Sequence, residues 1–221
     1  MILTWPCPGG GEEHALAFDH RREVRVLVLP ALFDEANKLR RFTVDVMRRL
    51  DAAGMDTVLP DLPGCNESLA PLESQTLAGW AEAAEAAAAH FGATHVLSIR
   101  GGALHAPPAL SEWRYAPATG ASLLRALLRA RIIAGKEAGI TESREALLER
   151  GRAEGLELAG YRLGARMIRE FESAEPMGGA ALANIAQSDV GGGGLWLRAE
   201  PDHSAEQADA LAALITRGLA R

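Results

Sequence analysis

Hydrophobic residues recur along the chain in two different patterns, and segments with one pattern alternate with segments of the other. A spacing of three to four residues predicts an amphipathic helix, whereas a short run of bulky or β-branched residues predicts a buried strand. The first predicted helix begins at Asp34, and its apolar face comprises Leu39, Phe42, Val46 and Leu50. Strands that alternate with such helices are typical of a mostly parallel sheet with helices on both faces. The predicted fold class is therefore α/β, with a doubly wound sheet.

Several runs have the composition of strands. They are His14–Asp19, Glu23–Leu29, Met55–Pro60, Val96–Ile99, Trp113–Ala116 and Leu195–Arg198. Only three residues separate the first two runs, so we expect them to form an antiparallel hairpin at the N-terminal edge of the sheet. Residues 1–13 hold Pro6, Pro8 and three consecutive glycines, which predict a loosely held lead-in. The run Ala180–Ile185 suits a helix and a strand equally.

The middle of the chain departs from this alternation, because Pro107 and Pro108 cut short any long helix after the fourth strand. Three helices and a short strand are predicted next, namely Ala121–Ala134, a helix that Thr141 caps and Gly151 ends, Leu156–Tyr161 and Leu163–Phe171. We expect residues 119–172 to be a lid-like segment. Its first helix carries Arg125 and Arg129, and Arg131 follows them; the three form either a basic strip or an ordinary solvated face.

Composition and charge narrow the function. The 221 residues suit one large domain over the whole chain. The formal net charge of -6 argues against binding of nucleic acid. The two cysteines, Cys7 and Cys65, suit a reducing compartment, and no stretch has the pattern of a signal peptide or the length of a membrane span. No residues have the spacing of a metal site. We expect a cytoplasmic protein with no cofactor and no metal.

The strand around Val96–Ile99 runs into a glycine-flanked turn. In serine hydrolases such a turn reads G-x-S-x-G and exposes the central serine as the nucleophile. Here the five positions read Ser98-Ile99-Arg100-Gly101-Gly102. A guanidinium stays protonated and offers only hydrogen-bond donors, so Arg100 cannot attack a carbonyl. The motif therefore predicts an architecture rather than a reaction.

Arg100 has two interpretations. At the turn it would project into the crevice at the carboxyl ends of the strands, where open α/β sheets bind ligands. The backbone N–H groups of Gly101 and Gly102 also favour an anion there, such as a carboxylate, a phosphate or an acidic saccharide. Alternatively, Arg100 forms an internal ion pair with Asp34 or Glu35.

The segment around residue 35 gives the remaining binding candidates. Glu35, Asn37, Lys38 and Arg41 form either the solvated face of an amphipathic helix, which suits Arg41 better, or the polar rim of a pocket with Arg100, which suits Asn37 better. Phe33 is a further ligand-binding candidate. His95 and His105 lie on either side of the turn, and we expect both on the surface.

A displaced active site is the other chemical hypothesis. Ser98 lies two residues before Arg100, on the same side of the strand but deeper. Cys65 follows another strand, and His203 lies after the last predicted one, where a triad histidine belongs, with Asp189 as candidate acid. Each also has a structural interpretation: a buried serine bonded to backbone, a packed cysteine, a surface histidine and a solvated loop residue.

Several segments resemble the α/β hydrolases and, among them, the exosortase A system-associated hydrolases of type 2. The matching segments are Pro30–Arg41, Asp61–Ser68, Ile99–Leu104, Pro117–Gly120 with Leu123–Arg131, and Leu156–Leu163. The family has a Leu-Arg-x-Gly-Ala-Leu elbow, so an arginine at the turn is itself part of the resemblance. Asn66 stands where glycine is usual in the second segment.

The resemblance implies a sheet of the α/β-hydrolase type and association with an exosortase and exopolysaccharide system of Gram-negative bacteria. Two functional hypotheses follow. In the first, the protein is a catalytically degenerate relative that binds an anionic ligand, such as an acidic saccharide, or a partner protein of that system. In the second, it is an ester or acyl hydrolase that uses Ser98 or Cys65 as a displaced nucleophile with His203.

Overall fold

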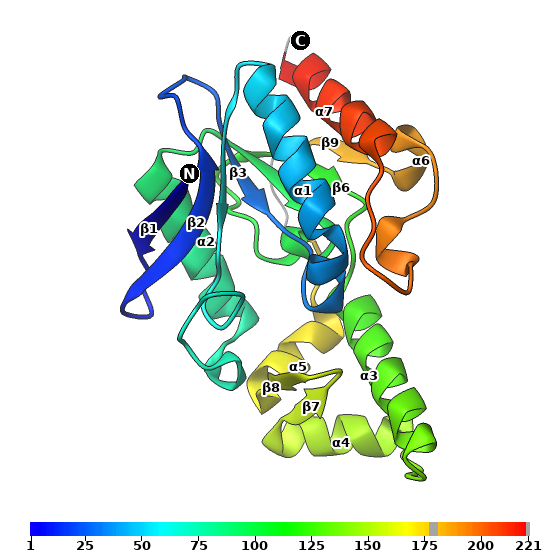
Figure 1. The fold of residues 1–221 in the computed structure, drawn as a ribbon. Helices are drawn as coiled ribbons and strands as arrows, with labels where there is room; N and C mark the ends of the chain where they lie inside the picture. The colour runs from blue at the N-terminus through cyan, green and yellow to red at the C-terminus, as the bar shows by residue number, and fades with distance from the viewer. Residues whose placement is uncertain (177–180, 220–221) are drawn as a thin grey trace.

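A computed structural model describes residues 1–176 and 181–219. Its centre is a seven-stranded sheet with the strand order β1-β2-β4-β3-β5-β6-β9 (Figure 1). The strands are β1 (Ile2–Pro6), β2 (Glu12–Phe18), β3 (Arg25–Leu29), β4 (Asp56–Pro60), β5 (His95–Ile99), β6 (Ser111–Tyr115) and β9 (Ala181–Ile185). Strands β4, β3, β5, β6 and β9 are parallel, while β2 pairs antiparallel with both β1 and β4. The mostly parallel sheet predicted from the sequence is confirmed.

Helices cover both faces of this sheet. Side chains of a strand point alternately to its two faces. In β3, Val26 and Val28 accordingly pack with α1 (Asp34–Ala52) and α7 (Ala205–Leu219). Leu27 and Leu29 pack on the opposite face with α2 (Leu77–Phe91). β3 is therefore buried on both sides, as its nearly continuous apolar run predicts.

The N-terminal hairpin is present, but it consists of other strands than the sequence pattern indicated. Residues 2–6 form β1 and pair with β2, so the predicted loose lead-in over residues 1–13 is a strand and a turn. The indole of Trp5 is fully buried and anchors this edge strand. β2 does not pair with β3, because β4 lies between them.

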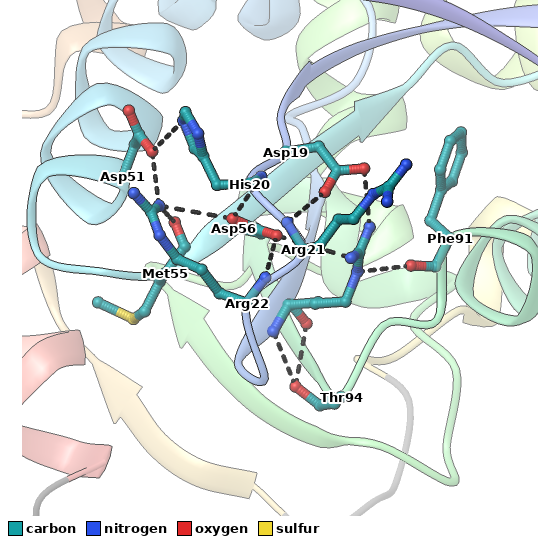
Figure 2. A network of polar contacts seen from close by, with 10 residues as sticks. Asp19, His20, Arg21, Arg22, Asp51, Met55, Asp56, Phe91 and Thr94 are labelled. Carbon is teal, nitrogen blue, oxygen red and sulfur yellow. Dashed lines mark hydrogen bonds and ion pairs between the residues drawn. The ribbon is translucent and has the colours of Figure 1, made fainter.

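A polar network fixes the connection from β2 to β3, which crosses the amino end of β4 (Figure 2). The buried carboxylate of Asp56, the first residue of β4, accepts hydrogen bonds from the backbone N–H groups of His20 at 3.0 Å and Arg22 at 2.8 Å. The guanidinium of Arg22 also bonds Asp51 at 2.6 Å. These contacts hold residues 19–24 across β4, and this explains why a connection short enough for a hairpin does not form one.

The last strand also differs from the prediction. The ambiguous run Ala180–Ile185 is a strand over its described part, Ala181–Ile185, and it pairs in parallel with β6. Leu195–Arg198, predicted as the last strand, instead contains the 3₁₀ turn η3 (Leu195–Leu197). Leu195 is buried against α1 and α7, while Leu197 projects outward with 78% of its surface exposed. One inward residue per turn suits a 3₁₀ turn and not a covered strand.

Residues 120–173 form a layer at the carboxyl ends of the central strands, drawn in green to yellow below the sheet in Figure 1. Its elements are α3 (Gly120–Glu137), α4 (Arg144–Glu154), β7 (Leu156–Leu158), β8 (Tyr161–Leu163) and α5 (Ala165–Ser173). The run predicted as one strand, Leu156–Tyr161, is split by a turn in which Ala159 and Gly160 have φ of 51° and 84°. The helix predicted from Leu163 begins at Ala165. The lid-like role of this layer stays a prediction.

Two short elements complete the chain: η1 (Leu72–Ser74) and α6 (Gln187–Val190). Among the described residues, no helix is both long enough and apolar enough to cross a membrane.

Candidate functional site

The turn after β5 has the strained geometry that the glycine-flanked motif predicts. β5 ends at Ile99, and Arg100, the first residue of the 3₁₀ helix η2 (Arg100–Leu104), has a positive φ of 55°. Positive φ is unfavourable for a residue with a side chain and persists only where the surroundings enforce it. The turn directs the Arg100 side chain toward Glu35 in the first turn of α1. We call Arg100–Gly102 the elbow.

The glycines of the elbow bring two chain segments into backbone contact. A Cβ atom on Gly102 would lie 2.3 Å from the carbonyl oxygen of Leu29 and 2.8 Å from that of Pro30. A Cβ atom on Gly101 would meet the side chains of Leu123 and Leu32 at 2.7 and 3.0 Å. The end of β3 thus lies directly against the elbow, and this contact places the start of α1 opposite Arg100.

Glu35 occupies the space in front of Arg100. Its two carboxylate oxygens accept hydrogen bonds from Nε and Nη2 of Arg100, both at 3.0 Å. Nη1 donates to the backbone carbonyl of Ala116 at 2.7 Å, and the guanidinium carbon lies 4.1 Å from the ring centre of Trp196. The side chains of Arg100 and Glu35 are only 15% and 16% exposed. Of the two interpretations of Arg100, the internal ion pair with Glu35 is therefore present, while Asp34 pairs with Lys38.

Phe33 and Asn37 take part in packing around the start of α1. Phe33 has a φ of 57°, and its ring contacts the rings of Trp80, Tyr161 and Phe171. The side-chain amide of Asn37 donates to the hydroxyl of Tyr161 at 3.0 Å. These contacts tie the β3–α1 segment to the layer formed by residues 120–173.

Ser98 lies beneath the elbow in a buried polar cluster. It is fully buried, and its hydroxyl donates to Glu112 at 2.5 Å. The other carboxylate oxygen of Glu112 accepts from Nε of Arg114 at 2.6 Å. The partner of Ser98 is thus a carboxylate on β6 and not the backbone group that its structural interpretation suggested. Glu112 was missed from the sequence, although Glu112 and Arg114 alternate with Trp113 and Tyr115 along β6 and this alternation was a signal for it.

His203 and Asp189 lie in local structures of their own. His203 lies just before α7, and its nearest carboxylate is that of the adjacent Asp202, 3.9 Å from Nδ1. The carboxylate of Asp189 accepts a hydrogen bond from the backbone N–H of Ala186 at the start of α6. Neither contact joins these residues to the elbow. A hydroxyl–imidazole contact does occur between Thr94 and His95, but it lies at the amino end of β5, opposite the elbow.

Cys65 has the environment of a packed thiol. Burial, together with the nearby carboxylates of Asp61 and Glu13, raises its pKa to about 12. Since the thiolate is the reactive form, this side chain is held in its inert state at neutral pH. Cys7 is also a free thiol whose pKa burial raises.

His105, predicted at the surface, is fully buried at the end of η2. Among the described residues neither of its ring nitrogens has a hydrogen-bond partner, and its ring lies edge-on to Trp80 at 6.0 Å. Desolvation lowers its pKa from 6.5 to about 4. The neutral imidazole therefore serves as a packing group in the core beside the elbow.

His105 makes the stability of the fold pH-dependent. The unfolded chain takes up a proton at this residue near pH 6.5, while the folded chain resists protonation down to about pH 4. Its contribution is therefore fully present above pH 6.5 and is lost as the pH falls toward 4. Because of His105, the free energy of unfolding should fall by about 2 kcal/mol between pH 8 and pH 5. We expect His105→Leu to abolish this fall. Urea unfolding at both pH values measures this, and an unchanged pH dependence in the variant would contradict it.

A cavity of about 600 Å³ opens beside the Arg100–Glu35 pair, between α3 and η3. Its apolar walls include Leu32, Phe33, Leu123, Leu127, Ile133 and Trp196. Its polar walls are Asp34, Glu35, Lys38, Ser122, Arg125 and Arg129. We call this cavity the α3 groove. Within the part of the chain that the structure describes, no cluster of three His, Cys, Asp or Glu residues could hold a metal ion.

Comparisons with known proteins bear on the fold. No protein-family model and no curated protein sequence matches the chain. Among solved structures, α/β-hydrolase domain-containing protein 10 from mouse superimposes with a TM-score of 0.52 at 14% identity, over 78% of this chain and 69% of that protein. The chain has the α/β-hydrolase fold.

Two further structures of this fold are less similar. An α/β serine hydrolase homologue from Coxiella burnetii has a TM-score of 0.42 at 14% identity, over 53% of this chain and 62% of that one. An α/β hydrolase from Novosphingobium aromaticivorans has a TM-score of 0.43 at 21% identity, over 58% and 49%. The chain thus spans less than two thirds of the length of either protein. At 14% identity, the likeness to the mouse protein shows the fold alone, and the activity has to be argued from the site.

The elbow can be compared with the corresponding turn of active α/β hydrolases. In active members the residue at this turn is the nucleophile, and the acid and the histidine follow it in chain order. This chain has Arg100 at that turn, hydrogen-bonded to a carboxylate that fills the adjacent space. The turn after β5 in this chain thus carries an ion-paired guanidinium.

Proposed function

We propose that this protein is a catalytically degenerate α/β-hydrolase-fold protein that binds an anionic ligand or a partner protein and does not hydrolyse esters. The observation that carries the proposal is the bidentate Glu35–Arg100 pair at the elbow. A guanidinium cannot serve as nucleophile or general base, because it stays protonated at working pH. The Glu35 carboxylate in front of it would also repel the oxyanion of an acyl-transfer intermediate.

The alternative hypothesis, an ester or acyl hydrolase with a displaced nucleophile, has weaker support. The Ser98 hydroxyl is buried and donates its proton to Glu112, so it lacks an imidazole base and access to solvent. The Cys65 thiol, with a pKa near 12, is not activated. A nucleophile needs an adjacent base that is itself oriented, and the hydrogen bond and ion pair of His203 go to its own neighbour Asp202.

We also propose, from the motif resemblance alone, that the protein works in an exosortase and exopolysaccharide system and in the cytoplasm. The free thiols of Cys7 and Cys65 are compatible with a reducing compartment. Purification of the tagged chain from a bacterium that carries such a system tests the association. Recovery of no component of that system would argue against it.

Labelling by a fluorophosphonate probe and turnover of p-nitrophenyl acetate test the central proposal. We expect neither to exceed the rate of a heat-unfolded control, because Arg100 occupies the elbow and neither the Ser98 hydroxyl nor the Cys65 thiol is activated. The variants Ser98→Ala, Cys65→Ala and His203→Ala serve as matched controls. Turnover by the natural chain that one of these substitutions abolishes would overturn the proposal and identify the displaced nucleophile or base.

A further inference from the structure

We infer that the α3 groove binds a single-chain amphiphile with an anionic head, of the chemical class of a long-chain carboxylate or an alkyl phosphate. The inference rests on the proposed function, since it treats the site beside the elbow as a binding site. It goes further by naming the ligand class and by assigning the binding of the anion to Arg125 and Arg129 instead of Arg100.

The size and lining of the groove suit the tail of such a molecule. Its volume of about 600 Å³ lies within the range of small-molecule sites, roughly 300–1,000 Å³. Most of its walls are hydrocarbon, from Leu32 and Phe33 on one side and Leu127 and Ile133 on α3 on the other. An alkyl chain placed there removes apolar surface from water, at about 0.8 kcal/mol per buried methylene group.

The charges of the groove suit an anionic head. The two acidic residues in its wall are already neutralised, because Asp34 pairs with Lys38 at 2.7 Å and Glu35 pairs with Arg100. Arg125 and Arg129, one helical turn apart on α3, are exposed, and no carboxylate of the described residues pairs with them. The groove therefore carries two uncompensated positive charges on one wall.

The next arginine on the same helix shows the difference. Arg131 donates to Glu142 at 2.9 Å, and this pairing raises the pKa of Arg131. Glu142 also accepts from Arg150, so that cluster is internally satisfied. Arg125 and Arg129 are thus available to an external carboxylate or phosphate, which an arginine binds by charge-assisted hydrogen bonds.

A small amphiphile fits better than a docked protein. A stable protein interface covers about 800 Å² on each partner. Around the groove, the large apolar residues that are substantially exposed are Ile133 at 48% and Leu197 at 78%. Two such residues on the rim offer too little exposed apolar surface for a helix to dock.

The groove contains its own reporter. Of the four tryptophans, Trp5, Trp80 and Trp113 are buried in the core, whereas Trp196 lines the groove and stacks on Arg100. A ligand in the groove should change the fluorescence of Trp196, and Trp196→Phe should abolish that change.

The test titrates the full chain with dodecanoate, dodecyl phosphate and neutral 1-dodecanol, each below its aggregation limit, by calorimetry and tryptophan fluorescence. Both anions are expected to bind at least about tenfold more tightly than the alcohol, a difference of about 1.4 kcal/mol. Arg125→Gln combined with Arg129→Gln should remove this preference, while Arg40→Gln, an exposed arginine on α1 outside the groove, should not. Ala130→Trp, which fills the groove from the surface of α3, should abolish binding of all three probes without changing the melting temperature.

Each outcome separates this inference from the proposed function. Absence of binding by either anion, equal binding by the alcohol, or unchanged binding in Ala130→Trp overturns the amphiphile site, even if the chain hydrolyses nothing. Turnover of p-nitrophenyl dodecanoate that Ser98→Ala abolishes overturns the proposed function, even if dodecanoate binds in the groove.

Discussion

Replacing Glu35 by glutamine is expected to lower the free energy of unfolding by about 3 kcal/mol, because it leaves Arg100 charged and largely buried without its counter-ion. The backbone carbonyl of Ala116 and the ring of Trp196 remain as partners, but neither carries a charge. For a chain of this length the loss corresponds to a fall in melting temperature of roughly 10 °C.

A double-mutant cycle with Arg100→Met identifies the source of this loss. If the pair is the cause, the double variant should be more stable than the sum of the two single losses allows, by about 0.5–3 kcal/mol. Arg48→Gln is the matched control, since Arg48 forms an exposed ion pair with Asp45 three residues away on α1. We expect that change to cost less than about 0.5 kcal/mol. Additive losses at Glu35 and Arg100 would mean that the pair does not hold the elbow together.

The Arg100–Glu35 pair shows which features of the site could be predicted from the sequence and which could not. The motif around residues 98–102 predicts a sharp turn with an arginine at its centre, because glycines close in sequence indicate where the backbone can turn sharply. The choice between an ion pair and an open anion site depends on where α1 begins relative to the elbow. That distance is set by a tertiary contact between Gly102 and the end of β3, which no local pattern encodes.

The misassigned hairpin has a related cause. Apolar runs predict strands over residues 14–19 and 23–29, and both strands exist. Their pairing was wrong because β4 arrives later in the chain and lies between them, with Asp56 binding the crossing segment. A short connection favours a hairpin only where no buried charge holds it across a third strand.

The functional candidates also divide into residues that a local motif predicts and residues whose role depends on tertiary structure. Arg100 and Glu35 each lie in a local sequence motif, and their side chains meet in the structure. Glu112, Trp196 and His105, which decide the chemistry around them, have no motif of their own. Their roles follow from burial: a carboxylate beneath Ser98, a ring on the guanidinium and an imidazole without partners.

Gly102→Ala is the second change for which we expect a large effect, a loss of more than about 3 kcal/mol in the free energy of unfolding. The new Cβ atom would lie 2.3 Å from the carbonyl oxygen of Leu29, the last residue of a central strand that is buried on both faces. Backbone there cannot move without breaking the contact between β3 and the elbow. Urea unfolding of the purified variant measures the loss, and failure to recover folded protein counts as its extreme form.

Two other glycines, one adjacent to Gly102 and one in the loop after α6, supply a graded series that tests this reason. Gly101→Ala would meet side-chain atoms of Leu123 and Leu32, which can shift more readily than backbone, so we expect a smaller loss of about 1 kcal/mol. Gly193→Ala meets nothing within 4 Å and should change stability by less than about 0.5 kcal/mol. If all three substitutions cost the same, the elbow is not held by close backbone approach, and the placement of Glu35 against Arg100 needs another cause. If the losses follow the order Gly102, Gly101, Gly193, the contact between strand and elbow is what positions the pair.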